Sequence, residues 1–151
     1  MRRLLIILIL SITISVTIQT VQAQSDNAQQ YKISELFKAM PDSLMPLLTT
    51  NNRLDMIDFM DAGMKARVTN LLNGESEMTC LTADSLTIRM SGSMDVSLYL
   101  QPTSETIDGY KQIICMKSIY RIASTKDPDE SFHYFSVNWR PIDKEKVKIK
   151  E

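Results

Sequence analysis

The sequence predicts an α+β fold in which N-terminal helices pack on one face of an antiparallel meander sheet of about five strands. Two observations predict it. Apolar residues recur every three or four positions over residues 53–73, whereas they recur every two positions from residue 77 onward, with short connections between the strand-like segments. The 151 residues, 44% of them hydrophobic and 23% charged, match one ordinary globular domain. We therefore expect a single α+β domain over residues 31–142.

The first 23 residues have the pattern of a secretory signal peptide. Arg2 and Arg3 precede an apolar stretch over residues 4–16, and the segment ends on the small-residue pattern Val21-Gln22-Ala23. We expect cleavage after Ala23, and the alternative is an uncleaved membrane anchor. Residues 24–30 are polar and predict a flexible lead-in, and no later segment is apolar enough to span a bilayer. The mature protein is therefore predicted to be exported.

Short helical segments are expected before the sheet. Residues 34–40 form a helix that Pro41 ends, and residues 42–45 add another turn before Pro46. Asn51-Asn52 then offers an N-cap for a longer helix.

The longer helix is expected over residues 53–73. Gly74 follows it as a C′ glycine, and Gly63 is a weak point inside it, costing about 1 kcal/mol against alanine. Its apolar stripe consists of Leu54, Ile57, Met60, Met64, Val68 and Leu71. This stripe is the predicted cover of the sheet.

Five strands are expected after Gly74, and alternation gives each an apolar and a polar face. They cover residues 77–81, 85–90, 94–101, 111–122 and 131–139. Ser91-Gly92-Ser93 predicts a hairpin turn, residues 102–109 a polar loop, and residues 126–130 a turn. The charged residues 143–151 predict either an exposed tail or an edge strand defended by charge.

The composition excludes several classes of function. The net charge of −1 leaves no basic excess for nucleic acid. One histidine and two cysteines cannot form a His-rich or four-Cys metal site. The sequence also contains no GxGxxG, GxxxxGK[ST] or HExxH motif. We therefore predict no cofactor and no metal, and favour a protein that is not an enzyme without settling that question.

Two periodic sets in the long helix suggest metals but have simpler interpretations. The thioethers of Met56, Met60 and Met64 could bind Cu(I). Their spacing is better explained by an adaptable stripe of core side chains. The carboxylates at Asp55, Asp58 and Asp61 lack the loop spacing of a calcium site. With Lys65 four residues after Asp61, a solvated helix face is the better interpretation.

The cysteines and the histidine are the remaining reactive groups. Cys80 and Cys115 could form a disulfide after export, but we favour free thiols because a meander separates their strands. His133 has Ser131 and Ser136 nearby but no G-x-S-x-G elbow, so it reads as a histidine at the edge of a packed face.

One surface for a partner is expected around the end of the last strand and on the polar face of the sheet. Its candidate residues are Trp139, Arg140, Tyr99 and Arg89. A tryptophan can anchor a partner or a sugar ring, although a lone tryptophan that closes a strand more often fills the core.

Several strings resemble an uncharacterised family of exported Bacteroidales proteins, the domain of unknown function 3256 (DUF3256). These strings are Leu36-Phe37-Lys38-Ala39-Met40-Pro41-Asp42-Ser43, the segment from Asn51 to Phe59, Met64-Lys65-Ala66 with Val68, Asn70 and Leu71, the segment from Leu81 to Leu86, and Trp139-Arg140-Pro141. The resemblance covers most of the mature chain and brings no catalytic residues. It implies the periplasm or outer surface of a Gram-negative anaerobe. Family members continue past the Trp-Arg-Pro segment, so the resemblance leaves open whether a C-terminal portion is missing.

The function predicted from these features is that of an exported, non-catalytic binding or adaptor module. Its partner is open between an envelope protein and a glycan. The alternatives are a small periplasmic hydrolase that uses His133 or a carboxylate pair, and a structural subunit of a cell-envelope assembly.

Overall fold

A computed structural model gives the structure of the protein and describes residues 31–121, 123 and 127–149. Helix α2 (Ile33–Lys38), the 3-10 turn η1 (Asp42–Leu44) and helix α3 (Thr50–Asp61) come first. The strands are β1 (Ala66–Thr69), β2 (Glu75–Leu81), β3 (Ser85–Ser91), β4 (Met94–Ile107), β5 (Tyr110–Tyr120), β6 (Asp129–Ser136) and β7 (Pro141–Ile142), followed by the 3-10 turn η2 (Lys144–Lys146). The predicted signal peptide and lead-in lie outside the described residues.

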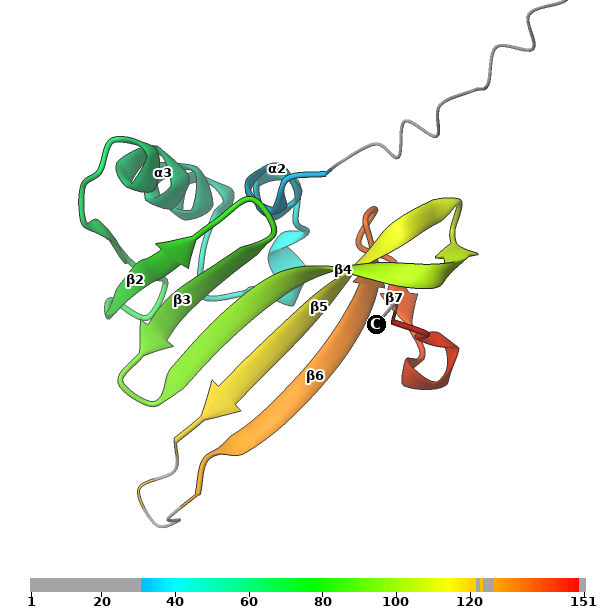
Figure 1. The fold of residues 1–151 in the computed structure, drawn as a ribbon. Coiled ribbons are helices and arrows are strands. Elements are labelled where there is room, and N and C mark those ends of the chain that lie inside the picture. The colour runs from blue at the N-terminus through cyan, green and yellow to red at the C-terminus, as the bar shows by residue number, and fades with distance from the viewer. Residues whose placement is uncertain (1–30, 122, 124–126, 150–151) are drawn as a thin grey trace, which may run out of the picture.

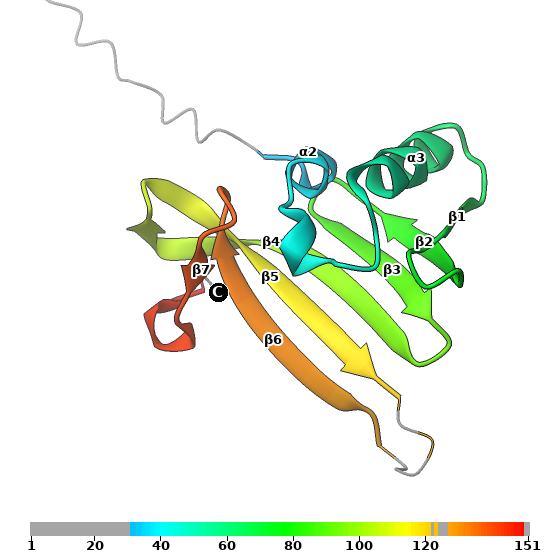
Figure 2. The ribbon, with the colours of Figure 1, turned by 180° about the vertical axis from the view of Figure 1, so that it is seen from behind.

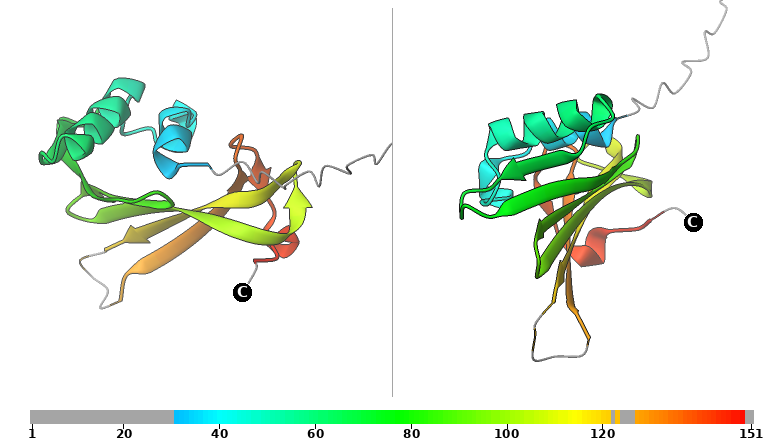
Figure 3. Two further views of the ribbon diagram at one scale, coloured as in Figure 1. Left: turned by 45° about the horizontal axis from the view of Figure 1, so that its top comes forward. Right: turned by 90° about the vertical axis from the view of Figure 1, so that its left-hand side faces the viewer.

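The strands form one antiparallel sheet whose order in space is their order along the chain (Figures 1 and 2). Helices α2 and α3 lie together on one side of this sheet, and the segment after β7 lies on the other side (Figure 3). The α+β meander with helices on one face is therefore confirmed. The expected number of strands is wrong, because the sheet has seven strands and not about five.

One additional strand, β1, comes from the segment that was expected to continue the long helix. Helix α3 ends at Asp61 because Gly63 has a φ of 67° and forms a Schellman motif. In this motif the Gly63 N–H donates to Met60 O at 3.0 Å and the Met64 N–H donates to Phe59 O at 2.8 Å. Gly63 is thus the helix terminator and not a weak point inside a helix. Beyond it, Val68 belongs to β1 and Leu71 is exposed in the turn that follows.

The start of α3 also differs from the expectation. Thr49 is the N-cap, and it forms a capping box with Asn52. The side chain of Asn52 also donates to Thr69 O at 3.3 Å, so the helix terminus covers the outer edge of β1. One edge of the sheet is therefore occupied by the protein's own side chain.

A second difference is the segment 102–109, which was expected to be a polar loop. Strand β4 continues through most of it, with a register shift between Pro102 and Ile107, and pairs again with β5 at Tyr110. The turn is Asp108-Gly109, and both residues have positive φ, at 51° and 85°. Asp-Gly is one of the dipeptides preferred in two-residue hairpin turns, so the polar composition of this segment marks an exposed hairpin.

The core lies between the helices and the middle of the sheet. The predicted alternation is confirmed in β3 and β4, where one set of side chains is buried under the helices: Leu86, Ile88, Met90, Val96, Leu98 and Leu100. Helix α3 contributes Met56 and Ile57 to this core, and α2 contributes Ile33, Leu36 and Phe37. Their apolar contacts hold short helices that would be marginal alone.

The guanidinium of Arg53 joins the three helical segments. It is 1% exposed, donates to Leu48 O at 3.2 Å and to Met40 O at 2.7 Å, and lies 5.9 Å from the centre of the Phe37 ring. Its charge is paired with Asp42, with 2.8 Å between Nη1 and Oδ1. A buried guanidinium requires such partners, because an unpaired charge inside a protein is strongly destabilising.

Trp139 closes the core from the other end of the chain. It is 7% exposed, packs beside Phe135, and donates its indole N–H to Leu36 O at 2.9 Å. Leu36 O is one of the last carbonyls of α2 and has no acceptor role within the helix, so the indole satisfies it. The backbone of Trp139 adopts a φ of 61°, which an L-residue rarely does, so this placement is held by the surrounding packing.

The first prediction concerns this contact. Replacing Trp139 with phenylalanine keeps an aromatic ring but leaves Leu36 O without its donor, which should cost about 1–3 kcal/mol of the free energy of unfolding. Urea unfolding followed by circular dichroism measures the change. Tyr99→Phe is the matched control and should change stability by less than about 0.5 kcal/mol, because Tyr99 is exposed. Equal stability of the two variants would contradict the role of the indole.

The second prediction concerns pH. The hydrogen bond from Arg53, and then that from Thr50, lowers the pKa of Asp42 below its usual value of 3.8. A lowered pKa in the folded state stabilises the fold fully above the ordinary pKa, and this contribution is lost as pH falls through the lower folded pKa. Asp42→Asn should therefore be less stable than the original protein at neutral pH, and the difference should shrink below pH 3.8. Urea midpoints measured at pH 7 and in acid test this; a difference that is constant with pH would contradict it.

Candidate functional site

The sheet has an open face, which we define as the face opposite the helices. Its residues alternate with the core residues along each strand. In register across the sheet, Tyr99 of β4, Cys115 of β5 and Tyr134 of β6 form one row, and Lys117 lies opposite Phe132 in the next row. The open face thus brings together side chains from three strands that are neighbours in the meander.

Four of these side chains form what we call the open-face cluster: Tyr99, Lys117, Phe132 and Tyr134. Tyr99 is 36% exposed and Phe132 is 48% exposed, whereas Tyr134 is half-buried. The Lys117 ammonium lies 5.5 Å from the centre of the Phe132 ring and 2.9 Å from Glu130 Oε1. The cluster therefore combines aromatic surface with a cation that its neighbours hold in place.

The chemistry around Cys115 shows how closely this part of the open face is packed. Cys115 is 4% exposed, and burial raises the pKa of its thiol above the usual value, an effect that Lys117 partly offsets. Burial also raises the pKa of Tyr134, with a smaller contribution from Cys115. Both groups are neutral at physiological pH, so the lysine is the charged member of the cluster.

The open face is partly covered at one end by the segment after β7 (Figure 3). Thr103 forms an isolated bridge with Ile149, and Lys148 pairs with Glu105 at 2.7 Å. This contact lies at the hairpin end of β4, away from Lys117 and Phe132. The cluster therefore stays accessible beside it.

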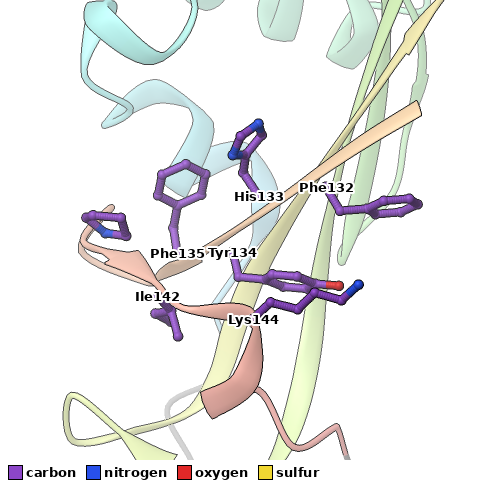
Figure 4. Close-up of a pocket in the computed structure, with 7 residues that line it drawn as sticks. Phe132, His133, Tyr134, Phe135, Ile142 and Lys144 are labelled. Atoms are coloured by element: carbon purple, nitrogen blue, oxygen red, sulfur yellow. The ribbon is translucent and has the colours of Figure 1, made fainter. Parts of the chain in front are cut away.

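A pocket of about 240 Å³ lies at the edge of the sheet where β7 ends (Figure 4). It is lined by Phe132, His133, Tyr134, Phe135, Pro141, Ile142 and Lys144. Figure 4 shows Phe132, Tyr134 and Lys144 on one side of β6, with His133 and Phe135 on the other side. At this edge Phe132 is exposed and Tyr134 is half-buried on one face, whereas on the other face His133 is exposed and Phe135 is buried.

The residues predicted as a partner surface do not form one cluster. Trp139 is buried in the core, whereas Arg140 is exposed in the connection between β6 and β7. Arg89 of β3 is exposed on the open face. Tyr99 of β4 lies opposite Ser85, which is four residues from Arg89 along β3. At about 3.3 Å per residue this separates the two by roughly 13 Å. Of the four, Tyr99 is the one that lies in the open-face cluster.

His133 is exposed on β6, on the side of the helices. Among the described residues, none donates to or accepts from its imidazole, and neither Ser131 nor Ser136 forms a hydrogen bond with it.

Asp61, the acid nearest to the predicted apolar stripe, is exposed. Within the described part of the chain, no group of three or more His, Cys, Asp or Glu residues is placed to hold a metal ion. No helix in that part is long and apolar enough to cross a membrane.

Phe132 and Tyr134 were not recognised from the sequence as candidate binding residues. The signal was present, because both alternate with His133 and Phe135 along a predicted strand. The sequence could not show that β5 carries apolar side chains on both faces, with Ile113 and Cys115 buried on the open face. That second apolar surface is what supports the aromatic side chains beside it.

The fold and the open-face cluster define a small α+β protein with an exposed aromatic surface and no assembled catalytic group among the described residues. The chain belongs to the family described as "Protein of unknown function (DUF3256)", whose model matches residues 20–150. No curated protein matches the chain.

One similar solved structure is that of a domain of an uncharacterized protein from Porphyromonas gingivalis W83. Its sequence is 20% identical, its TM-score is 0.60, and the match covers 76% of this chain. The match spans 55% of the length of that structure. The likeness establishes a shared fold.

The third prediction concerns the thiols. Cys80 is exposed and Cys115 is buried, and the two thiols do not form a disulfide. Ellman's reagent should therefore react quickly with one thiol per folded chain and with two after denaturation. Cys80→Ser should abolish the fast phase, whereas Cys115→Ser should leave it unchanged. A fast phase that survives in Cys80→Ser would show that Cys115 is accessible.

Proposed function

We propose that the protein is an exported, non-catalytic binding module and that the open-face cluster is its binding surface. The observation that supports this most directly is the exposure of Phe132 and Tyr99 on the face of the sheet opposite helices α2 and α3. Large aromatic side chains are enriched where proteins bind partners, since they provide contact area with little loss of conformational freedom.

The composition of the cluster indicates what it would bind. Tyrosine and phenylalanine rings offer flat apolar surface, and the Tyr99 hydroxyl and the Lys117 ammonium add polar groups at its border. This combination suits an envelope glycan or a protein surface with an acidic residue. Because the chain has no basic excess, with a net charge of −1, it is poorly suited to nucleic acid.

A hydrolase that uses His133 receives less support. The imidazole is exposed, has no orienting partner among the described residues, and lies across the sheet from the open-face cluster. A catalytic histidine requires a nucleophile or substrate within hydrogen-bonding distance and a group that orients it. The nearby pocket offers aromatic rings and Lys144, which suit binding better than proton transfer.

The fourth prediction tests the cluster. Tyr99→Ala with Lys117→Gln should weaken retention of the protein by its envelope ligand about tenfold or more, the usual effect of removing central contact residues. Cross-linking to envelope extract and screening on a glycan array measure retention, with Leu54→Ala as the control because Leu54 is exposed on α3.

Retention by the control but not by the double variant would support the cluster. Equal retention by both, from proteins with the same circular dichroism spectrum, would contradict it. His133→Ala should behave like the control; if it alone abolished a hydrolytic activity, the hydrolase alternative would replace this proposal.

A further inference from the structure

The two edges of the sheet differ in a way that matters for association. At the β1 edge, the side-chain amide of Asn52 donates a hydrogen bond to Thr69 O. At the other edge, β7 pairs only with Tyr134 and Phe135, so β6 from Asp129 to His133 has no strand neighbour on its outer side in the described chain. Proteins usually protect such an edge by proline, a bulge or charged side chains. The β5–β6 register has no bulge and β6 contains no proline, so the protecting groups of this stretch are the acidic residues Asp129 and Glu130.

The direction of the backbone groups on this edge follows from the turn after β6. The Ser136 N–H donates to Arg140 O, and Ser136 O accepts from the Trp139 N–H, so both Ser136 groups point away from β5. Because backbone groups alternate along an unbroken antiparallel strand, those of Tyr134, Phe132 and Glu130 also point outward. Tyr134 lies opposite Ile142 of β7. Phe132 and Glu130 are therefore the residues whose outward N–H and C=O groups face no strand in the described chain.

We propose that this edge pairs with the same edge of a second copy of the chain, related by a two-fold axis perpendicular to the sheet through Ser131. In this register Glu130 lies opposite Phe132 of the second copy, and Phe132 lies opposite its Glu130. The outward-pointing N–H and C=O groups of Glu130 and Phe132 in both copies are then hydrogen-bonded across the axis. A register centred on Phe132 would bring Glu130 opposite Tyr134, whose groups β7 already faces, and one centred on Glu130 would place two carboxylates together.

The side chains are complementary in this register. Lys144 lies beside Phe132 and Tyr134 on the open-face side of β6, where Glu130 of the second copy would arrive (Figure 4). On the other side of β6, Asp129 of the second copy would arrive opposite His133. Acidic groups therefore meet a lysine and an imidazole, and no like charges are opposed. Lys144 forms no ion pair with another described residue.

The pairing would also join the two open-face clusters. A two-fold axis perpendicular to the sheet keeps each face on its own side, so the clusters would form one surface across the dimer. A five-residue strand pair buries less than the roughly 1,200 Å² of a standard interface, so self-association should be weak and concentration-dependent. A ligand with repeated units would then bind both copies with increased avidity.

The fifth prediction tests the register by disulfide trapping in a Cys80→Ser background, which removes the exposed thiol. Residues directly opposite in a pair without mutual hydrogen bonds have Cα atoms about 4.5 Å apart, a distance that a disulfide spans. Ser131→Cys should therefore form linked dimers with diamide as oxidant. His133→Cys is the matched control and should not, because its own copy lies four residues away along the paired strands, roughly 13 Å.

Two further variants test the edge in the reduced protein by sedimentation equilibrium. Phe132→Pro removes one outward N–H from each copy without removing a donor to β5, so dimerisation should weaken roughly tenfold or more. Lys144→Glu should also weaken it, because the new carboxylate would face Glu130 of the second copy. This variant decides the question if Phe132→Pro does not fold.

Linked dimers from Ser131→Cys but not His133→Cys, together with weaker association of Lys144→Glu, would support the proposal. Equal trapping at both positions, trapping at neither, or association unaffected by Lys144→Glu would overturn it. The trapping and sedimentation experiments contain no ligand, so loss of ligand binding by the Tyr99→Ala and Lys117→Gln variant does not decide their outcome. The two proposals therefore fail independently.

Discussion

The contact between Trp139 and Leu36 is the constraint on which the rest of the structure depends. Two short helices cover a seven-stranded sheet, and neither is long enough to be stable without tertiary contacts. The indole satisfies a terminal carbonyl of α2 and fills the space beside Phe135, so the last part of the sheet fixes the first helix. Arg53 of α3 then extends this order through the carbonyls of Met40 and Leu48 and through its ion pair with Asp42 of η1. Buried polar groups, the indole of Trp139 and the terminal guanidinium nitrogens of Arg53, therefore position the helical layer at both of its ends.

Much of the fold could be predicted from periodicity, since alternation specifies which face of a strand is buried. The prediction from periodicity was wrong where the backbone conformation of a single residue determined the secondary structure. Gly63 stands within a stripe that fits a helix, yet its positive φ ends α3 and turns the following residues into β1. Nothing in the spacing of Val68 and Leu71 distinguishes these alternatives, because apolar residues four or three apart fit a helix whether or not it continues. The short β7 was missed because two residues carry no periodicity.

The candidate site was less predictable than the fold, for a different physical reason. Tyr99 was placed correctly on the polar face, but a surface consists of side chains from several strands, and register decides which of them meet. Arg89 and Tyr99 share a face and are still far apart, whereas Phe132 and Tyr134 become neighbours of Lys117 and Cys115 only through the pairing of β5 with β6. Trp139 has the chemistry of a partner-binding residue, and its burial became evident only with the position of α2.

The order of strands along the sheet also has a consequence for how the chain reaches this structure. Every strand pairs with its neighbour in sequence, so each hairpin closes a short loop at little entropic cost and the sheet can grow outward from β4 and β5. The indole contact instead spans 103 residues, and the closure of so long a loop favours its formation after the hairpins. Docking of the helical layer is then the late event in folding. Since Trp139 is the single tryptophan of the chain, its fluorescence follows the closing of this contact.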